Sequence, residues 1–229
     1  MQDEDFSQPF FNTLPPAVVA LALSMFAVEI FFWLGEAGII GGDEAIGWRT
    51  LAIRELGFFP PLIPWMIETG NWAPEHLLRF VSYLFLHWGF TSAIFSIVIL
   101  LAMGKLVGEV FGNLAVLILF FACGFFGALI FAGLAGSERP LVGAFPSVYG
   151  LIGAYTFLLW VRFGHMGQNQ YQAFTLIGFL MGIQLFFAIF FQVGSDWIAD
   201  IAGFTLGFFI APFLVKGALR QMLNRLRQR

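Results

Sequence analysis

Six long apolar segments dominate this sequence of 229 residues and restrict the folds open to it. About 20 mostly apolar residues are enough for a helix to cross the hydrocarbon core of a bilayer. Hydrophobic residues make up 59% of the chain and charged residues 11%, whereas soluble domains are about 45–50% apolar and about 25% charged. The sequence therefore predicts an all-α polytopic membrane protein with six transmembrane helices. The expected spans are 15–40, 90–106, 114–134, 146–163, 173–193 and 197–214.

Charges around the expected spans predict the domain boundaries and the orientation. Residues 1–14 form an N-terminal tail, residues 15–215 the membrane domain, and residues 216–229 a basic C-terminal tail. With both termini inside, seven lysines and arginines lie on the cytoplasmic side and four on the other. The positive-inside rule favours that orientation. The acidic start, MQDEDF, is unlike the basic start of a secretory signal.

A long connection, residues 41–75, separates the first two expected spans. It contains Trp48, Trp65 and Trp72 among short apolar runs broken by prolines. Tryptophan is enriched where lipid meets water, and broken apolar runs are too short to cross the bilayer. We expect an interfacial loop that lies half in the outer leaflet.

Composition also argues against several classes of function. A net charge of −3 gives no indication of nucleic-acid binding, and the single cysteine, Cys123, excludes an intrachain disulfide. His76, His87 and His165 are scattered without metal-ligand spacing. We therefore expect neither a metal nor a cofactor, and we expect His87 to donate to a backbone carbonyl in its turn.

Three stretches, in this order along the chain, resemble the rhomboid family of intramembrane serine proteases. They are RFVSYLFLHWGFTSAIFSI at residues 79–97, GAFPSVYGLIGAY at residues 143–155 and ADIAGFTLGFF at residues 199–209. They are similar to the arginine-led outer loop with its histidine-rich helix start, the G-x-S-G segment with a following tyrosine, and the histidine before a G-x-x-x-G pair. The resemblance covers about residues 15 to 215 and implies a six-helix rhomboid-like bundle. It also implies an integral membrane protein of the bacterial inner membrane.

Matched residue by residue, the family's catalytic groups are replaced. Phe145 stands at the serine nucleophile position and Asp200 at the histidine position. Ser92 and Ser96 stand where the family has oxyanion-stabilising groups. The outer-loop arginine is present as Arg79, and the resemblance implies a pocket formed by six residues: Phe145, Tyr149, Asp200, His87, Ser92 and Ser96.

Nearby residues offer two other routes to catalysis, and neither is favoured. Ser147 lies two residues beyond Phe145, which on a helix is roughly 200° away from the face of Phe145 and Tyr149; we expect it to be hydrogen-bonded locally near the helix start. Asp196 lies one turn before Asp200, and we expect it to be separately solvated at the water boundary.

Two further patterns concern the packing of the bundle. Phe145 and Tyr149 are four residues apart, so their rings can pack along one helix face and plug the pocket. Gly203 and Gly207 on the last span, with Gly150, Gly153 and Ala154 on the fourth, predict close helix packing.

Polar residues within the spans should have partners, because a charge at mid-span costs about 2.5–3.5 kcal/mol on insertion scales. For Asp200 the candidates are the Tyr149 hydroxyl, Ser92 and Ser96, unless water reaches it near the outer surface. Glu29 and Gln184 either bond internally or mark a contact with another membrane protein.

The resemblance with its replaced dyad predicts an inactive rhomboid-like protein rather than an enzyme. Its expected partners are transmembrane helices of other proteins, in a scaffold, assembly or quality-control role or as a subunit of a larger membrane complex. The first alternative is an active intramembrane serine-type endopeptidase with non-standard catalytic groups. A small transporter or channel subunit is the second, suggested by Glu29, Asp200 and Gln184; the two halves show no inverted repeat that would support it.

Overall fold

The structure, a computed structural model, describes residues 14–136, 139–191 and 194–214, except for the side chains of 184–191. The expected N-terminal tail, apart from Leu14, and the expected C-terminal tail lie outside these ranges. The long helices in chain order are α1 (Pro16–Glu36), α5 (Phe90–Phe111), α6 (Asn113–Leu134), α7 (Phe145–His165), α8 (Thr175–Phe191) and α9 (Trp197–Leu214). Each coincides with one of the six apolar segments.

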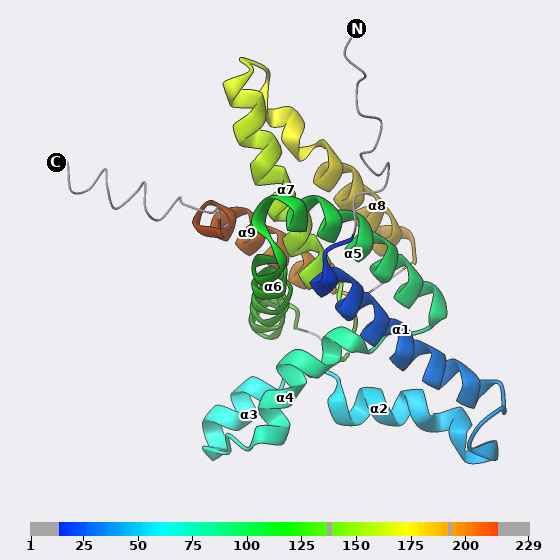
Figure 1. The fold of residues 1–229 in the computed structure, drawn as a ribbon. Coiled ribbons are helices and arrows are strands. Elements are labelled where there is room, and N and C mark those ends of the chain that lie inside the picture. Colours follow the sequence, from blue (N-terminus) through cyan, green and yellow to red (C-terminus); the bar gives the residue numbers. More distant parts are fainter. Residues whose placement is uncertain (1–13, 137–138, 192–193, 215–229) are drawn as a thin grey trace, which may run out of the picture.

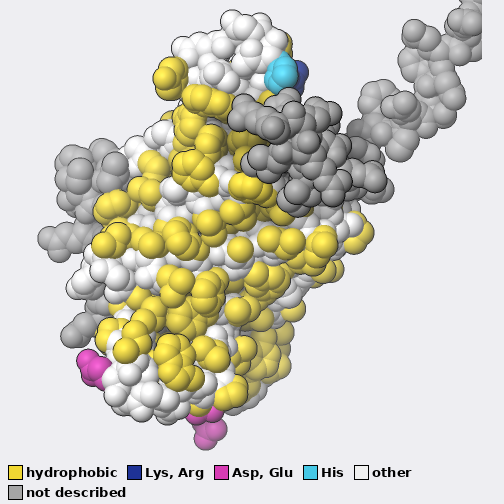
Figure 2. Space-filling model, turned by 90° about the vertical axis from the view of Figure 1, so that its left-hand side faces the viewer, with side chains coloured by type: hydrophobic (Ala, Val, Ile, Leu, Met, Phe, Trp, Pro, Cys, Tyr) yellow, Lys and Arg dark blue, Asp and Glu magenta, His cyan; other side chains and the backbone are white. Residues whose placement is uncertain are grey.

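Four of these helices, α1, α5, α6 and α9, are long and apolar enough to cross a membrane, judged on the described residues. Figure 2 shows a broad apolar band over one side of the molecule, with the few visible charged side chains near its ends. Helices with apolar side chains facing outward are typical of a bundle in lipid. The fold is therefore that of a helical integral membrane protein.

Two helix boundaries differ from the prediction for local reasons. α1 ends at Glu36 rather than near residue 40, and α5 continues to Phe111 rather than stopping near residue 106. Gly112 follows with φ +88° and is the only residue between α5 and α6. This positive φ is accessible to glycine and strained for other residues, so glycine allows the chain to change direction within one residue.

The connection after α1 is helical, so the expected loop was wrong in its local structure. It contains η1 (Gly42–Gly47), α2 (Trp48–Leu56), α3 (Leu62–Thr69), α4 (Pro74–Ser82) and η2 (Tyr83–Phe85). Gly57 and Gly70 end α2 and α3 after about two turns without preventing helix formation, and Gly70 closes α3 in the left-handed conformation. We call residues 42–85 the outer lobe; Figure 1 shows α2, α3 and α4 grouped at one end of the bundle.

α7 is the central helix and packs against α9, α6 and α5. α1 packs on α5, where an added Cβ on Gly104 would lie 2.8 Å from both methyl carbons of Val18. Gly104 therefore provides the space for α1, as small residues commonly do between membrane helices. These contacts fix the position of α7, whose first turn carries the matched nucleophile position.

Candidate functional site

Backbone hydrogen bonds to the outer lobe position the start of α7. Leu141 and Phe58 exchange two such bonds, of 2.8 and 3.2 Å, and the Gly143 N–H donates to the Tyr83 carbonyl at 2.9 Å. Gly143 has φ +108°, a conformation that only glycine adopts without strain. These hydrogen bonds and the backbone conformation of Gly143 therefore set the position at which Phe145 begins α7.

Phe145 and Tyr149 lie in one hydrophobic cluster at the first turns of α7. Tyr149 is buried and Phe145 half-buried, and the cluster also includes Ile99 of α5, Ile177 of α8 and Phe204 of α9. The two rings do not form a direct ring–ring pair among the described aromatic contacts. Both residues nevertheless contribute to the same apolar filling between α5, α7, α8 and α9.

Ser147 is fully buried and faces α6. Its hydroxyl donates to the Phe120 carbonyl at 2.5 Å, and an added Cβ on Gly124 would lie 2.6 Å from its Oγ. The expected local bond was wrong, because the acceptor belongs to the neighbouring helix. Ser147 is thus turned away from the cluster of Phe145 and Tyr149 and is bonded between helices.

Asp200 lies in the first turns of α9 and is only 3% exposed. It lies within electrostatic range of the hydroxyls of Tyr83 and Tyr149. The Ser96 hydroxyl is fully buried and has no hydrogen-bond partner among the described residues, which rules it out as the partner of Asp200. Ser92 is half-buried one turn earlier on α5.

His87 lies beside the start of α7, with its imidazole next to Gly143. An added Cβ on this glycine would be 3.6 Å from His87 Cδ2 and 3.4 Å from Phe145 Cδ2. Neither ring nitrogen makes a hydrogen bond of good geometry within the described ranges, so the expected donation to a carbonyl of the turn is reduced to a weak interaction with the Phe85 backbone. Burial, together with the charge of Arg49, lowers the pKa of His87 to about 4, against a small opposing effect of the Phe85 backbone. The imidazole is therefore neutral at pH 7.

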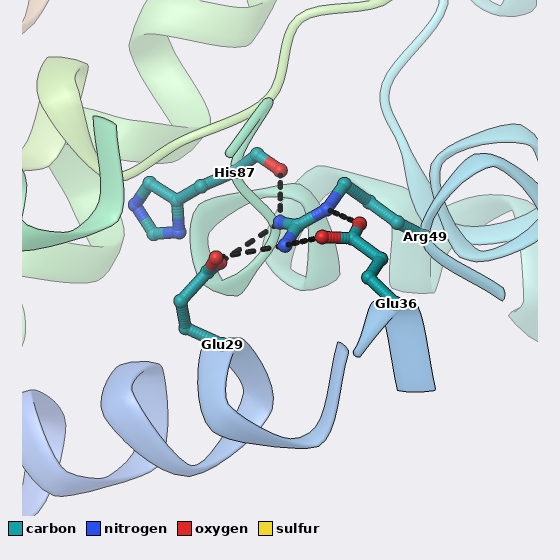
Figure 3. Close-up of polar contacts among 4 residues, drawn as sticks. All are labelled: Glu29, Glu36, Arg49 and His87. Atoms are coloured by element: carbon teal, nitrogen blue, oxygen red, sulfur yellow. Dashed lines mark hydrogen bonds and ion pairs between the residues drawn. The ribbon is translucent and has the colours of Figure 1, made fainter. Parts of the chain in front are cut away.

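Arg49 is the centre of a buried ion cluster that sequence reasoning missed (Figure 3). Its Nη1 and Nη2 donate to the two carboxylate oxygens of Glu29 at 2.9 and 2.8 Å, and its Nε donates to Glu36 at 2.7 Å. Nη1 also donates to the His87 carbonyl at 3.1 Å. Arg49 thus ties α1 to α2 and to the main chain that enters α5.

The ion cluster provides hydrogen-bond and ion-pair partners for the carboxylate of Glu29, a residue that is 1% exposed. Burial lowers the pKa of Arg49, but hydrogen bonds with and the charges of Glu29 and Glu36 outweigh it, so the pKa is raised above its usual value. The internal alternative for Glu29 is confirmed. Four arginines follow Glu29 on the expected outer side, so a search for its partner among them would have included Arg49. The side chain of Gln184 lies outside the described residues.

Arg79 connects α4 with the end of α2. Its Nη1 donates to the carbonyls of Arg54 and Gly57 at 3.0 and 3.4 Å, where the C-terminus of α2 leaves carbonyls without helical partners. Its guanidinium also lies 5.9 Å from the Phe59 ring centroid. The matched family arginine therefore holds the outer lobe together.

The predicted glycine contact between α7 and α9 is confirmed. An added Cβ would collide with a backbone carbonyl of the facing helix at three of the four predicted glycines: Gly203 with Pro146, Gly207 with Gly150, and Gly153 with Phe204. On Gly150 it would collide with Cys123 of α6 instead. The two helices that carry the matched dyad positions thus approach with almost no side chain between them.

The other histidines lie apart from this site. His76 meets the Trp65 ring edge-on at 4.9 Å, and His165 is exposed at the end of α7. In the part of the chain that the structure describes, no three His, Cys, Asp or Glu side chains are grouped as metal ligands.

Fold and site together define a helical integral membrane protein with a short-helix outer lobe that positions two closely packed helices. The Rhomboid domain matches residues 74–217, and the chain belongs to the rhomboid family. This finding confirms the resemblance seen in the motifs.

Two curated relatives match the chain at low identity. Rhomboid-type serine protease 2 of Emericella nidulans is 24% identical over 157 residues, which cover 68% of this chain and 31% of the relative. RHOMBOID-like protein 1 of Arabidopsis thaliana is 23% identical over 227 residues, which cover 90% of this chain and 54% of the relative. The chain thus spans about a third to about half of these relatives. Both are eukaryotic proteins, so they lend no support to the expected bacterial inner membrane.

Proposed function

We propose that this chain is a catalytically inactive rhomboid family member that binds transmembrane segments of other membrane proteins. The observation that carries the proposal is the pair of replacements at the matched dyad: Phe145 begins α7 and Asp200 lies in α9, on the two helices that pack most closely. A phenyl ring has no nucleophilic group, so acyl transfer at that position has no attacking atom.

The surroundings of Phe145 support this proposal. Ser147 is the nearest hydroxyl along α7, and it is buried against α6 with its proton donated to the Phe120 carbonyl. A nucleophile must lie within reach of a base and of the substrate, and Ser147 is turned away from the pocket side. Phe145 instead joins an apolar cluster that fills the space between α5, α7, α8 and α9.

The proposed partners are transmembrane helices, because a family scaffold with an apolar filling in its pocket can hold a helix without cutting it. We place both termini in the cytoplasm by the positive-inside rule, and a scaffold, assembly or quality-control role follows from helix binding. Purification from native membranes in mild detergent, followed by mass spectrometry, will identify the bound helices. An Asp200→Asn variant that folds and binds the same partners would remove Asp200 from the binding role.

The test of inactivity restores the dyad. We expect the native chain neither to cleave a model transmembrane substrate nor to react with a serine-directed fluorophosphonate. The Phe145→Ser/Asp200→His variant should gain labelling at position 145, while Phe145→Ser alone, the matched control, should gain much less because it lacks the base. Cleavage by the native chain would overturn the proposal. A restored variant that folds but stays silent would show that the pocket has diverged beyond the dyad.

One observation favours a second candidate, an active intramembrane endopeptidase with non-standard groups: the matched Emericella nidulans relative is named a serine protease. This candidate requires a reactive hydroxyl in the native chain. Labelling of the native protein by the fluorophosphonate, abolished by Ser147→Ala, would support it.

A further inference from the structure

An apolar groove lies between α1, α2, the end of α4 and η2, on elements separate from the matched dyad. Its volume is about 580 Å³, and its lining consists of Ala27, Val28, Phe31, Phe32, Ala52, Leu56, Ser82, Phe85 and Leu86. Ser82 has the only polar side chain among these residues, and its hydroxyl already donates to the Leu56 carbonyl at 2.6 Å. An occupant therefore meets hydrocarbon walls and gains no hydrogen bond from the lining side chains.

The ion cluster and two further contacts hold the walls of this groove apart at a fixed distance. Arg49 joins Glu29 to the His87 carbonyl, and each of these residues is close in sequence to a lining residue. Phe31 stacks on Trp48 at 5.0 Å with an interplanar angle of 9°. The Arg49 guanidinium also lies 5.2 Å from the Phe32 ring centroid. The groove is therefore preformed, which lowers the entropic cost of filling it.

The groove lies at the depth of lipid acyl chains. Its α1 residues, 27–32, precede the helix end at Glu36 by four to nine residues, or about 6–14 Å at 1.5 Å per residue. Half of a hydrocarbon core is about 15 Å thick. This section of α1 therefore lies within the outer half of the hydrocarbon layer.

Size and charge select the occupant. One turn of α-helix, 5.4 Å long and about 10–12 Å wide, fills roughly 400–600 Å³, so the groove has room for about one turn and not for a spanning helix. A single acyl chain is narrow and flexible enough to fill it. At the Leu56 end, Arg79 binds the carbonyls that flank Leu56 through Nη1 alone. Its Nε and Nη2 donors have no bond to other described residues and suit a phosphate.

We propose that this groove is a binding site for one acyl chain of a membrane phospholipid, with the lipid phosphate at Arg79. This site is separate from the proposed binding of transmembrane helices of other proteins, which we call client binding. It lies on α1, α2, the end of α4 and η2 rather than at the Phe145 cluster. The bound lipid would fill the space between the outer lobe and α1.

The test uses the full chain in phosphatidylcholine vesicles that contain phosphatidylglycerol with a photoreactive diazirine in one acyl chain. After illumination, mass spectrometry should find the label concentrated on residues 27–32 and 52–56. Ala52→Phe fills the groove and should lower labelling there about tenfold, since it removes contact with at least two methylene groups. Ala102→Phe, an exposed alanine on α5, is the matched control and should change nothing.

A second pair of variants tests the phosphate contact. Arg79→Gln should lower groove labelling by the phosphatidylglycerol probe about tenfold, and Arg79→Lys, which keeps the charge, should lower it less. Thermal unfolding checks that each variant is folded. Labelling spread evenly over all lipid-facing helices, or groove labelling unchanged by Ala52→Phe in a folded protein, would overturn the proposal. A protein helix crosslinked to position 52 in native membranes would also overturn the lipid proposal. None of these outcomes would bear on the proposed client binding.

Discussion

The two helix junctions that shape this molecule are built on opposite principles. At the junction of α7 with α9, glycines bring backbone against backbone, and an added Cβ at Gly203 or Gly207 would collide with a carbonyl. At the junction of α1 with α2, side chains meet through a buried ion cluster around Arg49. The first junction tolerates no added atoms, while the second does not tolerate the loss of one charge without its partner. Variants that add or remove groups therefore separate the two modes of packing.

Removal of one charge at the α1–α2 junction should have the largest effect. Arg49→Met leaves the 1% exposed Glu29 carboxylate buried without its partner, and we expect a loss of about 4 kcal/mol in the free energy of unfolding. Reversible denaturation in detergent micelles measures this loss. The double variant Glu29→Leu/Arg49→Met removes both charges and should recover most of the stability, because the desolvation penalty is removed along with the attraction. A double variant as unstable as Arg49→Met would show that the pair itself is the source of stability.

Addition of atoms at the α7–α9 junction should have the second-largest effect on the free energy of unfolding. Gly207→Val directs a branched side chain at the Gly150 carbonyl, and we expect a loss of about 3 kcal/mol, near the upper end for overpacking, because neither backbone can move independently. Gly133→Val on α6 is the matched control, since an added Cβ there meets nothing within 4 Å. Equal losses in both variants, measured in the same denaturation experiment, would contradict the close-packing argument.

The glycine junction was predictable from sequence, and the charged junction was not. G-x-x-x-G spacing places small residues on one helix face, so Gly203 and Gly207 signal a close approach wherever that helix packs. The partner of Glu29 lies 20 residues away on a short helix that hydropathy does not reveal, because α2 is neither long nor apolar. Ser147 shows a related limit: helical periodicity predicted its direction, but its acceptor on α6 depends on how the helices pack.

The stability of the fold should also depend on pH through His87, whose main-chain carbonyl accepts a hydrogen bond from Arg49. The pKa of His87 is lowered to about 4 in the fold and is about 6.5 when unfolded, so between these values the unfolded chain binds more protons. Stability from this group is complete above pH 6.5 and is lost as pH falls toward 4. The expected loss between pH 7.5 and pH 5 is about 2 kcal/mol.

Denaturation at several pH values measures this loss, and His87→Leu supplies the comparison. That variant has no titrating group at position 87, so its stability should vary with pH by about 2 kcal/mol less than that of the native chain. If both proteins show the same pH dependence, other groups account for it, and the imidazole is not held neutral by burial and by Arg49.

The smallest predicted effect tests whether Ser147 belongs to helix packing or to chemistry. Ser147→Ala removes the hydroxyl that donates to the Phe120 carbonyl, and we expect a loss of about 1 kcal/mol, the usual net value of one hydrogen bond. Thr156→Val is the matched control: Thr156 is also buried on α7, but its hydroxyl donates to the Ile152 carbonyl within the same helix, and valine replaces the hydroxyl with a methyl group of similar size. A larger loss at Ser147 than at Thr156, with client binding intact, fits a packing role. Loss of client binding or of probe labelling without loss of stability would instead return Ser147 to the functional site.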